Sequence, residues 1–214
     1  MKRALVTGGG GRLGAAMARW LGARGWDVAV HYATSHQGAA AVVADIAAAG
    51  QNGVALKADL LDEGQMASLV ARAAQALGGP LTLLVNNASV FEPDDLKSAT
   101  RTSWDRHIDS NLRAPFVLIQ QFAPQVPPPV PDEFDEPVAQ GLVVNMLDQK
   151  VLKLTPGFMS YTIAKMGLWA LTRTAAQALA PAVRVNAIGP GPTLQGARQT
   201  PANFKGQRRA TVLQ

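Results

Sequence analysis

The sequence predicts a doubly wound parallel α/β sheet with helices on both faces. Short β-rich runs alternate with longer helical runs, which is the pattern of strands joined by crossover helices. The β-rich runs are nearly continuous in apolar residues, as strands covered on both faces are. A chain of 214 residues with 48% hydrophobic content fits one domain, which we expect to span residues 1–214.

The expected elements follow one another in a regular order. Six strands are predicted at residues 4–7, 28–32, 54–57, 81–85, 142–147 and 183–188. The helices between them run from Leu13 to Leu21, through an alanine-rich stretch that closes at Gly50, and from Met66 to Leu77. A further helix covers residues 103–122, and the last one carries Tyr161 and Lys165. This order is that of a Rossmann-type fold.

A proline-rich segment precedes the fifth strand. Five prolines fall within residues 124–131, and the acidic residues 132–136 follow. Proline is excluded from helix interiors and central strands. We expect a surface loop here, with a proline-rich docking motif as the alternative.

Composition excludes several classes of function. The chain has no Cys, so disulfides, thiolate metal sites and Cys nucleophiles are excluded, and no metal site is expected. It lacks a signal-peptide core and an apolar stretch of the roughly 18 residues that a membrane span needs, so we expect a cytoplasmic protein without membrane contact. The net charge of +5 comes from dispersed Lys and Arg, and an anionic small ligand explains it without nucleic acid.

Glycine and polar residues gather where the expected strands end. In strand order they are Gly8, Thr34 with Ser35, Asp59, Asn86 with Asn87, Asp148, and Pro190 with Gly191. The carboxyl ends of parallel strands form the edge at which open α/β sheets bind ligands. We therefore expect the functional site at this edge.

The first of these termini has the pattern of a phosphate-binding turn. Residues 7–14 contain Gly9, Gly11 and Gly14 in the spacing G-x-G-x-x-G, between a strand and a helix. Glycines let the backbone approach a pyrophosphate, and the helix offers its unpaired N–H groups. The sequence therefore predicts dinucleotide binding.

The end of the second strand indicates which dinucleotide is bound. No acidic residue stands within residues 31–35 to bind a free ribose hydroxyl, whereas Arg12, Thr34 and Ser35 are available. A guanidinium and two hydroxyls suit a 2′-phosphate, so NADP(H) is favoured over NAD. The alternative for Arg12 is a solvated helix residue.

Tyr161 and Lys165 form the candidate reactive pair. Four residues apart, they share one face of a helix, and a nearby ammonium would hold the pKa of the phenol below its usual value of about 10. Such a phenol can donate a proton near neutral pH. The pair alone also fits an ordinary helix surface, so its interpretation depends on the rest of the chain.

Together these motifs resemble those of the short-chain dehydrogenase/reductase family over essentially the whole chain. The glycine motif of that family falls on Thr7, Gly8 and Gly14, with Arg12 in place of its middle glycine. The remaining family positions are Asn86-Asn87-Ala88-Ser89, Asn111, Tyr161 with Lys165, and Pro190-Gly191.

The resemblance implies a role for each matched residue. Tyr161 is the implied proton donor, Lys165 binds the nicotinamide ribose and lowers the tyrosine pKa, and Asn111 helps to position a water. The implied NADP(H)-binding residues are Thr7, Gly8, Arg12, Leu13, Gly14, Tyr32, Thr34, Ser35, Asp59, Leu60, Asn87, Ala88, Ser89, Tyr161, Lys165, Pro190, Gly191 and Thr193. Asn86 and Asn87 fit equally well as residues that tie strands together.

Asp148 departs from the family pattern, because most members have a serine 13 residues before the tyrosine. An ionised carboxylate cannot donate a hydrogen bond to a carbonyl, which favours a nitrogenous substrate. With Arg12, Ser89 and Phe91, Asp148 resembles the pteridine reductase branch, in which NADPH reduces a C=N bond. The implied substrate residues are Ser89, Phe91, Asp148 and Tyr161. The alternatives are a packed loop aromatic for Phe91 and a capping carboxylate for Asp148.

The end of the chain is a further departure from the resemblance. Family members usually continue through another helix and a seventh strand, so we expect this chain to lack the last strand and to end in a polar tail from Gln195. The charged content of 16% and the family together predict a homo-oligomer, a tetramer or dimer.

The sequence thus predicts an NADPH-dependent reductase of a pterin-like substrate such as a dihydropterin or dihydrofolate. One alternative is a short-chain reductase of another ketone or imine. The other is a nucleotide-binding regulatory protein without turnover.

Overall fold

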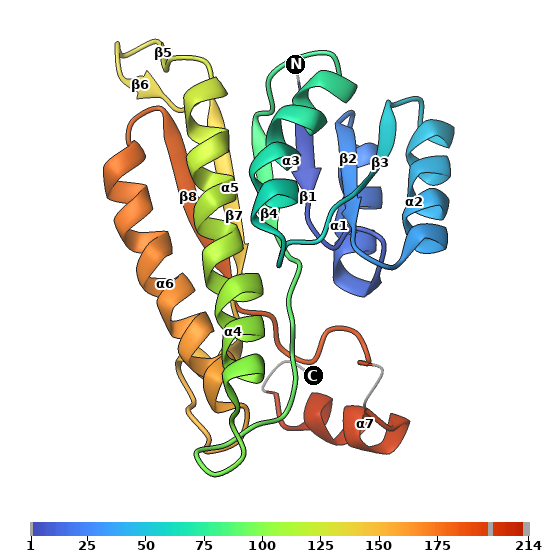
Figure 1. Cartoon of the computed structure of the whole chain (residues 1–214). Helices are drawn as coiled ribbons and strands as arrows, with labels where there is room; N and C mark the ends of the chain where they lie inside the picture. The colour runs from blue at the N-terminus through green and yellow to red at the C-terminus, as the bar shows by residue number, and fades with distance from the viewer. Residues whose placement is uncertain (1, 197–198, 212–214) are drawn as a thin grey trace.

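The computed structural model describes residues 2–196 and 199–211 and contains one six-stranded parallel sheet (Figure 1). Its strands are β1 (Arg3–Val6), β2 (Asp27–Tyr32), β3 (Gly53–Lys57), β4 (Leu83–Asn86), β7 (Gly141–Met146) and β8 (Val183–Ile188). Their order in the sheet is β3-β2-β1-β4-β7-β8, and each adjacent pair is parallel. The order reverses between β1 and β4, so the predicted doubly wound sheet is confirmed.

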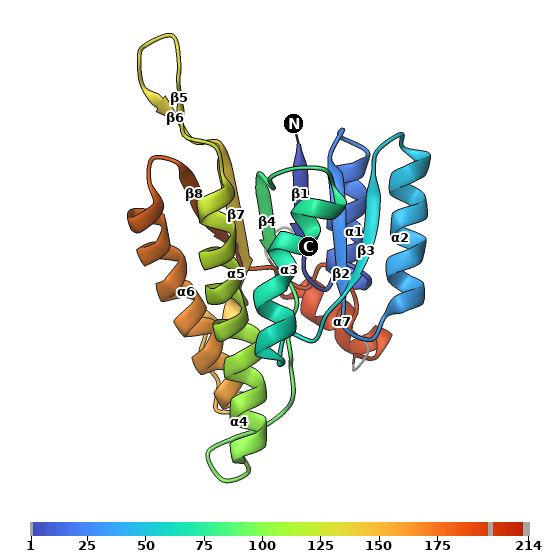
Figure 2. The same cartoon turned by 45° about the horizontal axis from the view of Figure 1, so that its top comes forward.

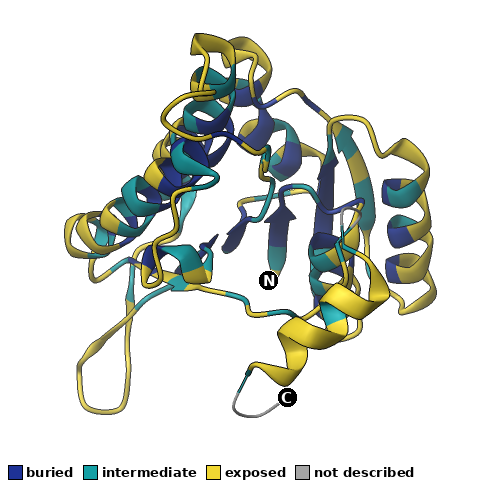
Figure 3. Cartoon of the chain, turned by 90° about the horizontal axis from the view of Figure 1, so that it is seen from below, coloured by how far each residue is buried: buried dark blue, intermediate teal, exposed yellow. Residues whose placement is uncertain are grey.

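Two apolar cores lie on the two faces of this sheet. Helices α1 (Arg12–Gly22) and α2 (His36–Ala48) cover one face, and α3 (Glu63–Ala76), α5 (Ala114–Phe122) and α6 (Met159–Leu179) cover the other (Figures 1 and 2). Strand alternation supplies both cores, because Leu5 packs under α3 and α5 while Ala4 and Val6 pack under α1 and α2. The buried residues form the sheet and the inner faces of the helices, as Figure 3 shows.

The helix expected over residues 103–122 is interrupted. It consists of α4 (Arg101–Ile108), a π turn η1 (Asp109–Arg113) and α5. Pro115 explains the interruption, because it cannot donate to the carbonyl of Asn111 and its ring crowds that carbonyl. The π turn therefore falls on Asn111, and such turns often occur at functional sites.

The proline-rich segment is an exposed excursion before β7. It contains the 3₁₀ turn η2 (Ala123–Gln125) and a hairpin of two-residue strands, β5 (Val130–Pro131) and β6 (Pro137–Val138). The predicted surface loop is correct apart from these short strands. The hairpin leads into the amino end of β7, at the end of the sheet opposite the glycine turn (Figure 1).

The expected polar tail contains a helix, α7 (Pro201–Arg209). The Thr200 side chain accepts a hydrogen bond from the Asn203 backbone N–H, and Pro201 occupies the first turn, where its missing N–H costs nothing. No seventh strand joins the sheet within the described residues. No helix in that part of the chain is long and apolar enough to cross a membrane.

Candidate active site

The turn after β1 is held by Thr7 and Asn87. Thr7 Oγ1 accepts hydrogen bonds from the backbone N–H groups of Asn87 (2.9 Å) and Ala88 (3.0 Å). Asn87 Nδ2 donates to the carbonyls of Thr7 (2.8 Å) and Gly8 (3.3 Å). The β1 and β4 termini are thereby locked together, which favours the strand-tying role for Asn87.

His31 supports the same turn from beneath, a role the sequence did not indicate. Its Nδ1 accepts from the Gly8 N–H at 3.0 Å, and its Nε2 lies 3.1 Å from the Ala58 carbonyl, so the proton resides on Nε2. The ring is 1% exposed, and burial lowers the pKa of His31 to about 4. His31 is therefore a neutral, fixed partner of the glycine turn.

Close backbone packing explains two of the glycines. Gly8 has φ of +62°, which disfavours any side chain. A Cβ on Gly14 would overlap the Gly8 carbonyl. The turn therefore keeps its backbone clear, and Gly11 begins α1 without a side-chain cap, which leaves N–H groups of the first turn facing outward.

Arg12 and Ser35 lie at this edge with partners of their own. Arg12 Nη2 donates to the Leu194 carbonyl at 2.9 Å and so reaches the segment that follows β8. Ser35 Oγ donates to the Gly10 carbonyl at 3.1 Å, and Thr34 beside it is exposed. Arg12 thus connects the start of α1 to the segment after β8, and Ser35 connects the segment after β2 to the glycine turn after β1.

The remaining predicted cofactor residues surround this edge. Asp59 Oδ1 accepts from the Leu61 N–H at 2.9 Å, and the Thr193 N–H donates to the Gly191 carbonyl at 2.7 Å in a tight turn after β8. The others follow strands of the same sheet or begin α1, and they are Leu13, Tyr32, Leu60, Ala88, Ser89 and Pro190.

Tyr161 and Lys165 lie in the first turns of α6, and both are buried, with 5% and 3% of their surface exposed. The Tyr161 hydroxyl donates to Asp148 Oδ2 at 3.0 Å. Lys165 Nζ donates to the Met146 carbonyl at 2.8 Å and lies 5.7 Å from the centre of the Tyr161 ring. The pair shares a face as predicted, but the ammonium is directed at the end of β7.

The predicted lowering of the tyrosine pKa is wrong for this structure. Burial, the charge of Asp148 and the hydrogen bond to Asp148 raise the pKa of Tyr161, and a hydrogen bond with Ser89 opposes them. Burial also lowers the pKa of Lys165 to about 8. The reason is positional, since a carboxylate and not the ammonium contacts the phenol. Tyr161 is therefore protonated at neutral pH, as a proton donor has to be.

Asp148 has the capping role considered for it and also contacts the phenol. Its Oδ1 accepts from the Lys150 N–H at 2.9 Å and caps the 3₁₀ turn η3 (Gln149–Val151), while its Oδ2 accepts from Tyr161. The cap fixes the carboxylate, so the second oxygen is aimed at the phenol.

Asparagine side chains brace the part of the site around Tyr161. Asn111 is fully buried and pairs with the Val90 backbone, accepting from its N–H at 3.0 Å and donating to its carbonyl at 2.8 Å. Asn86 Nδ2 donates to Asn145 Oδ1 at 2.8 Å, and Asn145 Nδ2 donates to Thr172 in α6. The expected Asn111 water stays a prediction, because the observed role of this side chain is to hold the backbone before Phe91.

Two stacked phenylalanines stand beside the phenol. The rings of Phe91 and Phe158 are 4.3 Å apart and 12° from parallel, and Phe91 meets the Tyr161 ring edge-on at 4.7 Å. Phe158 precedes α6 with φ of +59°, which is uncommon for an aromatic residue. The sequence indicated Phe91 but not Phe158. Phe91 is still 41% exposed, so it can contact a ligand.

Residues 2–204 match the family model for short chain dehydrogenase. The chain belongs to the short-chain dehydrogenase family. FolM alternative dihydrofolate reductase 1 from Brucella canis, solved with NADP, shares 42% identity and a TM-score of 0.89 over 99% of this chain and 80% of that one. Its counterpart from Brucella suis, also solved with NADP, shares 43% identity and a TM-score of 0.86 over 96% and 78% of the two chains.

Relatives found by sequence have other names. The 3-oxoacyl-[acyl-carrier-protein] reductase FabG of Staphylococcus aureus is 33% identical over 191 residues, which cover 89% of this chain and 74% of FabG. The 3beta-hydroxysteroid dehydrogenase 1 of Eggerthella lenta is 34% identical over 205 residues, or 94% and 72% of the two chains. The family is therefore established, and the chemistry of this short-chain dehydrogenase is that of an oxidoreductase.

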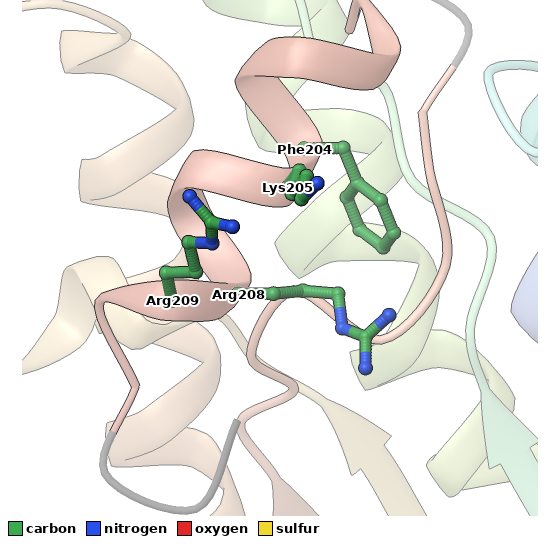
Figure 4. Close-up of a pocket in the computed structure, with 4 residues that line it drawn as sticks. All are labelled: Phe204, Lys205, Arg208 and Arg209. Carbon is green, nitrogen blue, oxygen red and sulfur yellow. The ribbon is translucent and has the colours of Figure 1, made fainter.

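The predicted site residues lie along the edge of the sheet where the strands end. A separate hollow of about 370 Å³ lies against α7 and is lined by Phe204, Lys205, Arg208 and Arg209 (Figure 4). None of the predicted site residues lines it. In Figure 1, α7 lies at the end of the sheet where the strands terminate.

Proposed function

We propose that this short-chain dehydrogenase uses NADPH to reduce a C=N bond of a pterin-like substrate such as a dihydropterin or dihydrofolate. The hydrogen bond from Tyr161 to Asp148, beside the partly exposed ring of Phe91, is the observation that carries this proposal. A carboxylate and a flat aromatic ring at the reacting edge fit a planar heterocycle with N–H groups.

The cofactor proposal is supported by the glycine turn. A Cβ at Gly11 would meet no atom within 4 Å, so the backbone is open at this position, and the uncapped start of α1 offers N–H groups and the positive end of the helix dipole to a pyrophosphate. Arg12 adds a cation at the rim, which suits the 2′-phosphate of NADPH. The NADP in both solved FolM structures supports the same choice.

NADPH would supply the hydride to the carbon of the C=N bond. Tyr161 would donate its O–H proton to the ring nitrogen, and the Lys165 ammonium, 5.7 Å from the ring, would offset the phenolate charge. Asp148 would accept an N–H of the substrate while its other oxygen stays fixed by the Lys150 backbone. Phe91 would stack on the heterocycle.

A second candidate is reduction of a ketone, favoured by the similarity to FabG and to the hydroxysteroid dehydrogenase. Asp148 argues against it, because an ionised carboxylate repels the developing alkoxide oxygen that a serine would stabilise.

The deciding assay follows NADPH oxidation with a dihydropterin, dihydrofolate and a simple ketone for wild type and Asp148→Ser. We expect the wild type to reduce the pterin or folate, and the variant to lose this activity while keeping or gaining activity on the ketone. A wild type that reduces the ketone and neither heterocycle would refute the substrate proposal.

We also propose a homo-oligomer. Trp104 in α4, Phe116 in α5 and Ile163 in α6 are each 41–42% exposed, and such apolar residues suit subunit contacts. Sedimentation analysis would test this, and a monomer at micromolar concentration would contradict it.

A further inference from the structure

Three buried polar side chains behind the aromatic pair form a continuous chain of hydrogen bonds. Asp94 lies in the connection between β4 and α4, His107 lies in α4, and Ser160 directly precedes Tyr161 in α6. They are 5%, 0% and 1% exposed. The connection runs along the edge of the molecule toward the start of α6, as Figure 1 shows. The predicted site contains none of these three residues.

The hydrogen bonds have a defined direction. The Glu92 N–H donates to His107 Nε2 at 3.1 Å, so this nitrogen carries no proton and Nδ1 does. Nδ1 lies 2.6 Å from Ser160 Oγ and donates to it, and the Ser160 hydroxyl donates to Asp94 Oδ2. Each donor therefore has one acceptor, from the Glu92 backbone to the Asp94 carboxylate.

This hydrogen-bond network fixes the backbone next to Phe91 and Phe158. The Asp94 carbonyl accepts from the Phe158 N–H at 2.7 Å, and Asp94 Oδ1 accepts from the Ser160 N–H at 3.2 Å, which together hold the start of α6. Phe91 lies between two anchors, Val90 on Asn111 and Glu92 on His107. Both phenylalanines next to Tyr161 therefore depend on this network for their position.

We propose that Asp94, His107 and Ser160 are positioning residues that hold Phe158 against Phe91 and Phe91 against Tyr161, and so set the space for a flat substrate ring. The statement that the substrate is a flat ring rests on the proposed function, whereas the anchoring of the backbone around Phe91 does not. The competing interpretation is a buried polar cluster that stabilises the whole domain and affects cofactor and substrate equally.

Two substitutions of His107 each remove one of its two hydrogen bonds, to Glu92 or to Ser160. In His107→Asn the side-chain amide replaces Nδ1 and can still donate to Ser160, but the acceptor for Glu92 is lost. In His107→Gln the side-chain oxygen replaces Nε2 and can still accept from Glu92, but the donor to Ser160 is lost. His31→Gln is the matched control, because it alters an equally buried histidine that contacts Gly8 on the cofactor side.

The first measurement is hydrogen exchange of the peptide containing residues 88–95, made without substrate. We expect faster exchange in His107→Asn than in wild type, near-normal exchange in His107→Gln, and no change in His31→Gln. This result does not require that the substrate be a pterin, so it separates the positioning role from the proposed function.

The second measurement compares the KM of the best substrate with the Kd of NADPH. We expect His107→Asn to raise KM roughly tenfold, as loss of one buried hydrogen bond does, with the NADPH Kd within twofold of wild type. His31→Gln should show the opposite pattern. Unchanged exchange and KM in both His107 variants, or an equal weakening of NADPH and substrate, would overturn the proposal.

Discussion

The cofactor side and the catalytic side of the sheet edge hold their polar side chains in different ways. On the cofactor side, side chains bond to the main chain, as Thr7, His31 and Asn87 do. On the catalytic side, main-chain bonds such as that of Lys165 to Met146 are joined by bonds between side chains, as in Tyr161 with Asp148 and Ser160 with Asp94. A bond to the main chain needs the right residue at one position, whereas a bond between side chains needs two. The cofactor side is therefore specified by fewer residue identities than the catalytic side, although both sides join segments that are distant in sequence.

The largest expected effect tests a pair on the catalytic side. Tyr161→Phe keeps the ring and removes the proton, so turnover should fall by the roughly 10²–10⁴ that positioned proton transfer contributes, while the NADPH Kd stays near that of wild type. Single-turnover kinetics and fluorescence titration would measure the two quantities. Near-normal turnover would mean that Asp148 or water supplies the proton, and the assignment of Tyr161 as the proton donor would be wrong.

The next effect tests His31 on the cofactor side. Its pKa is about 4 in the folded protein against 6.5 in the unfolded chain, so between these values the unfolded chain binds more protons. The contribution of neutral His31 to the free energy of unfolding is fully present above pH 6.5. It is lost as the pH falls toward 4, which lowers the free energy of unfolding by about 3 kcal/mol. Urea unfolding at pH 7.5 and 4.5 would measure this loss.

His31→Gln is the control for that measurement, because glutamine does not titrate. The difference in unfolding free energy between the two pH values should be smaller in the variant. His107, whose pKa burial also lowers, remains in both proteins and does not disturb the comparison. Equal acid sensitivity of both proteins would contradict the assignment.

A smaller effect tests the backbone packing of the glycine turn. Gly14→Ala places a Cβ against the Gly8 carbonyl, and overpacking of this kind costs about 1–3 kcal/mol. Gly11→Ala is the matched control, because a Cβ there meets no atom within 4 Å. Thermal unfolding should show a lower midpoint for Gly14→Ala and a midpoint close to wild type for Gly11→Ala. Similar midpoints for both variants would show that the glycine turn shifts to accommodate a Cβ at position 14.

The smallest effect concerns cofactor choice. Arg12→Gln should reduce the preference for NADPH over NADH roughly tenfold, because it removes one charge-assisted phosphate contact from an exposed rim. Arg24→Gln is the control, since that guanidinium stacks on Trp20 at the other end of α1. Equal affinity of the wild type for the two cofactors would remove Arg12 from the site.

The comparison also explains what the sequence could predict. The six strands, their alternation with helices along the chain and the glycine turn depend on local patterns, and the structure has them within a few residues. The sequence indicates Tyr161, Lys165 and Asp148, and the structure brings Tyr161 into contact with Asp148, with the Lys165 ammonium 5.7 Å from the centre of the tyrosine ring. The predicted direction of the tyrosine pKa is wrong, because spacing along a helix does not reveal that the Lys165 ammonium turns to Met146.

Other features depend on contacts that no local pattern encodes. Ser160 meets Asp94 across 66 residues and His107 across 53, so none of the three stood out in the sequence. Phe158 gave no signal either, because its left-handed backbone is set by contacts with the Asp94 carbonyl. The π turn at Asn111 had a local cause in Pro115, and this signal was available in the sequence.

The β5–β6 hairpin has a practical consequence for attaching the protein to a surface. Phe134, between β5 and β6, is 77% exposed. The hairpin lies beyond the amino ends of the strands, away from the edge where the strands terminate (Figure 2). Since the chain contains no cysteine, Phe134→Cys would create a single thiol for maleimide coupling. A protein immobilised through that thiol would present its reactive edge to the solution in one uniform orientation.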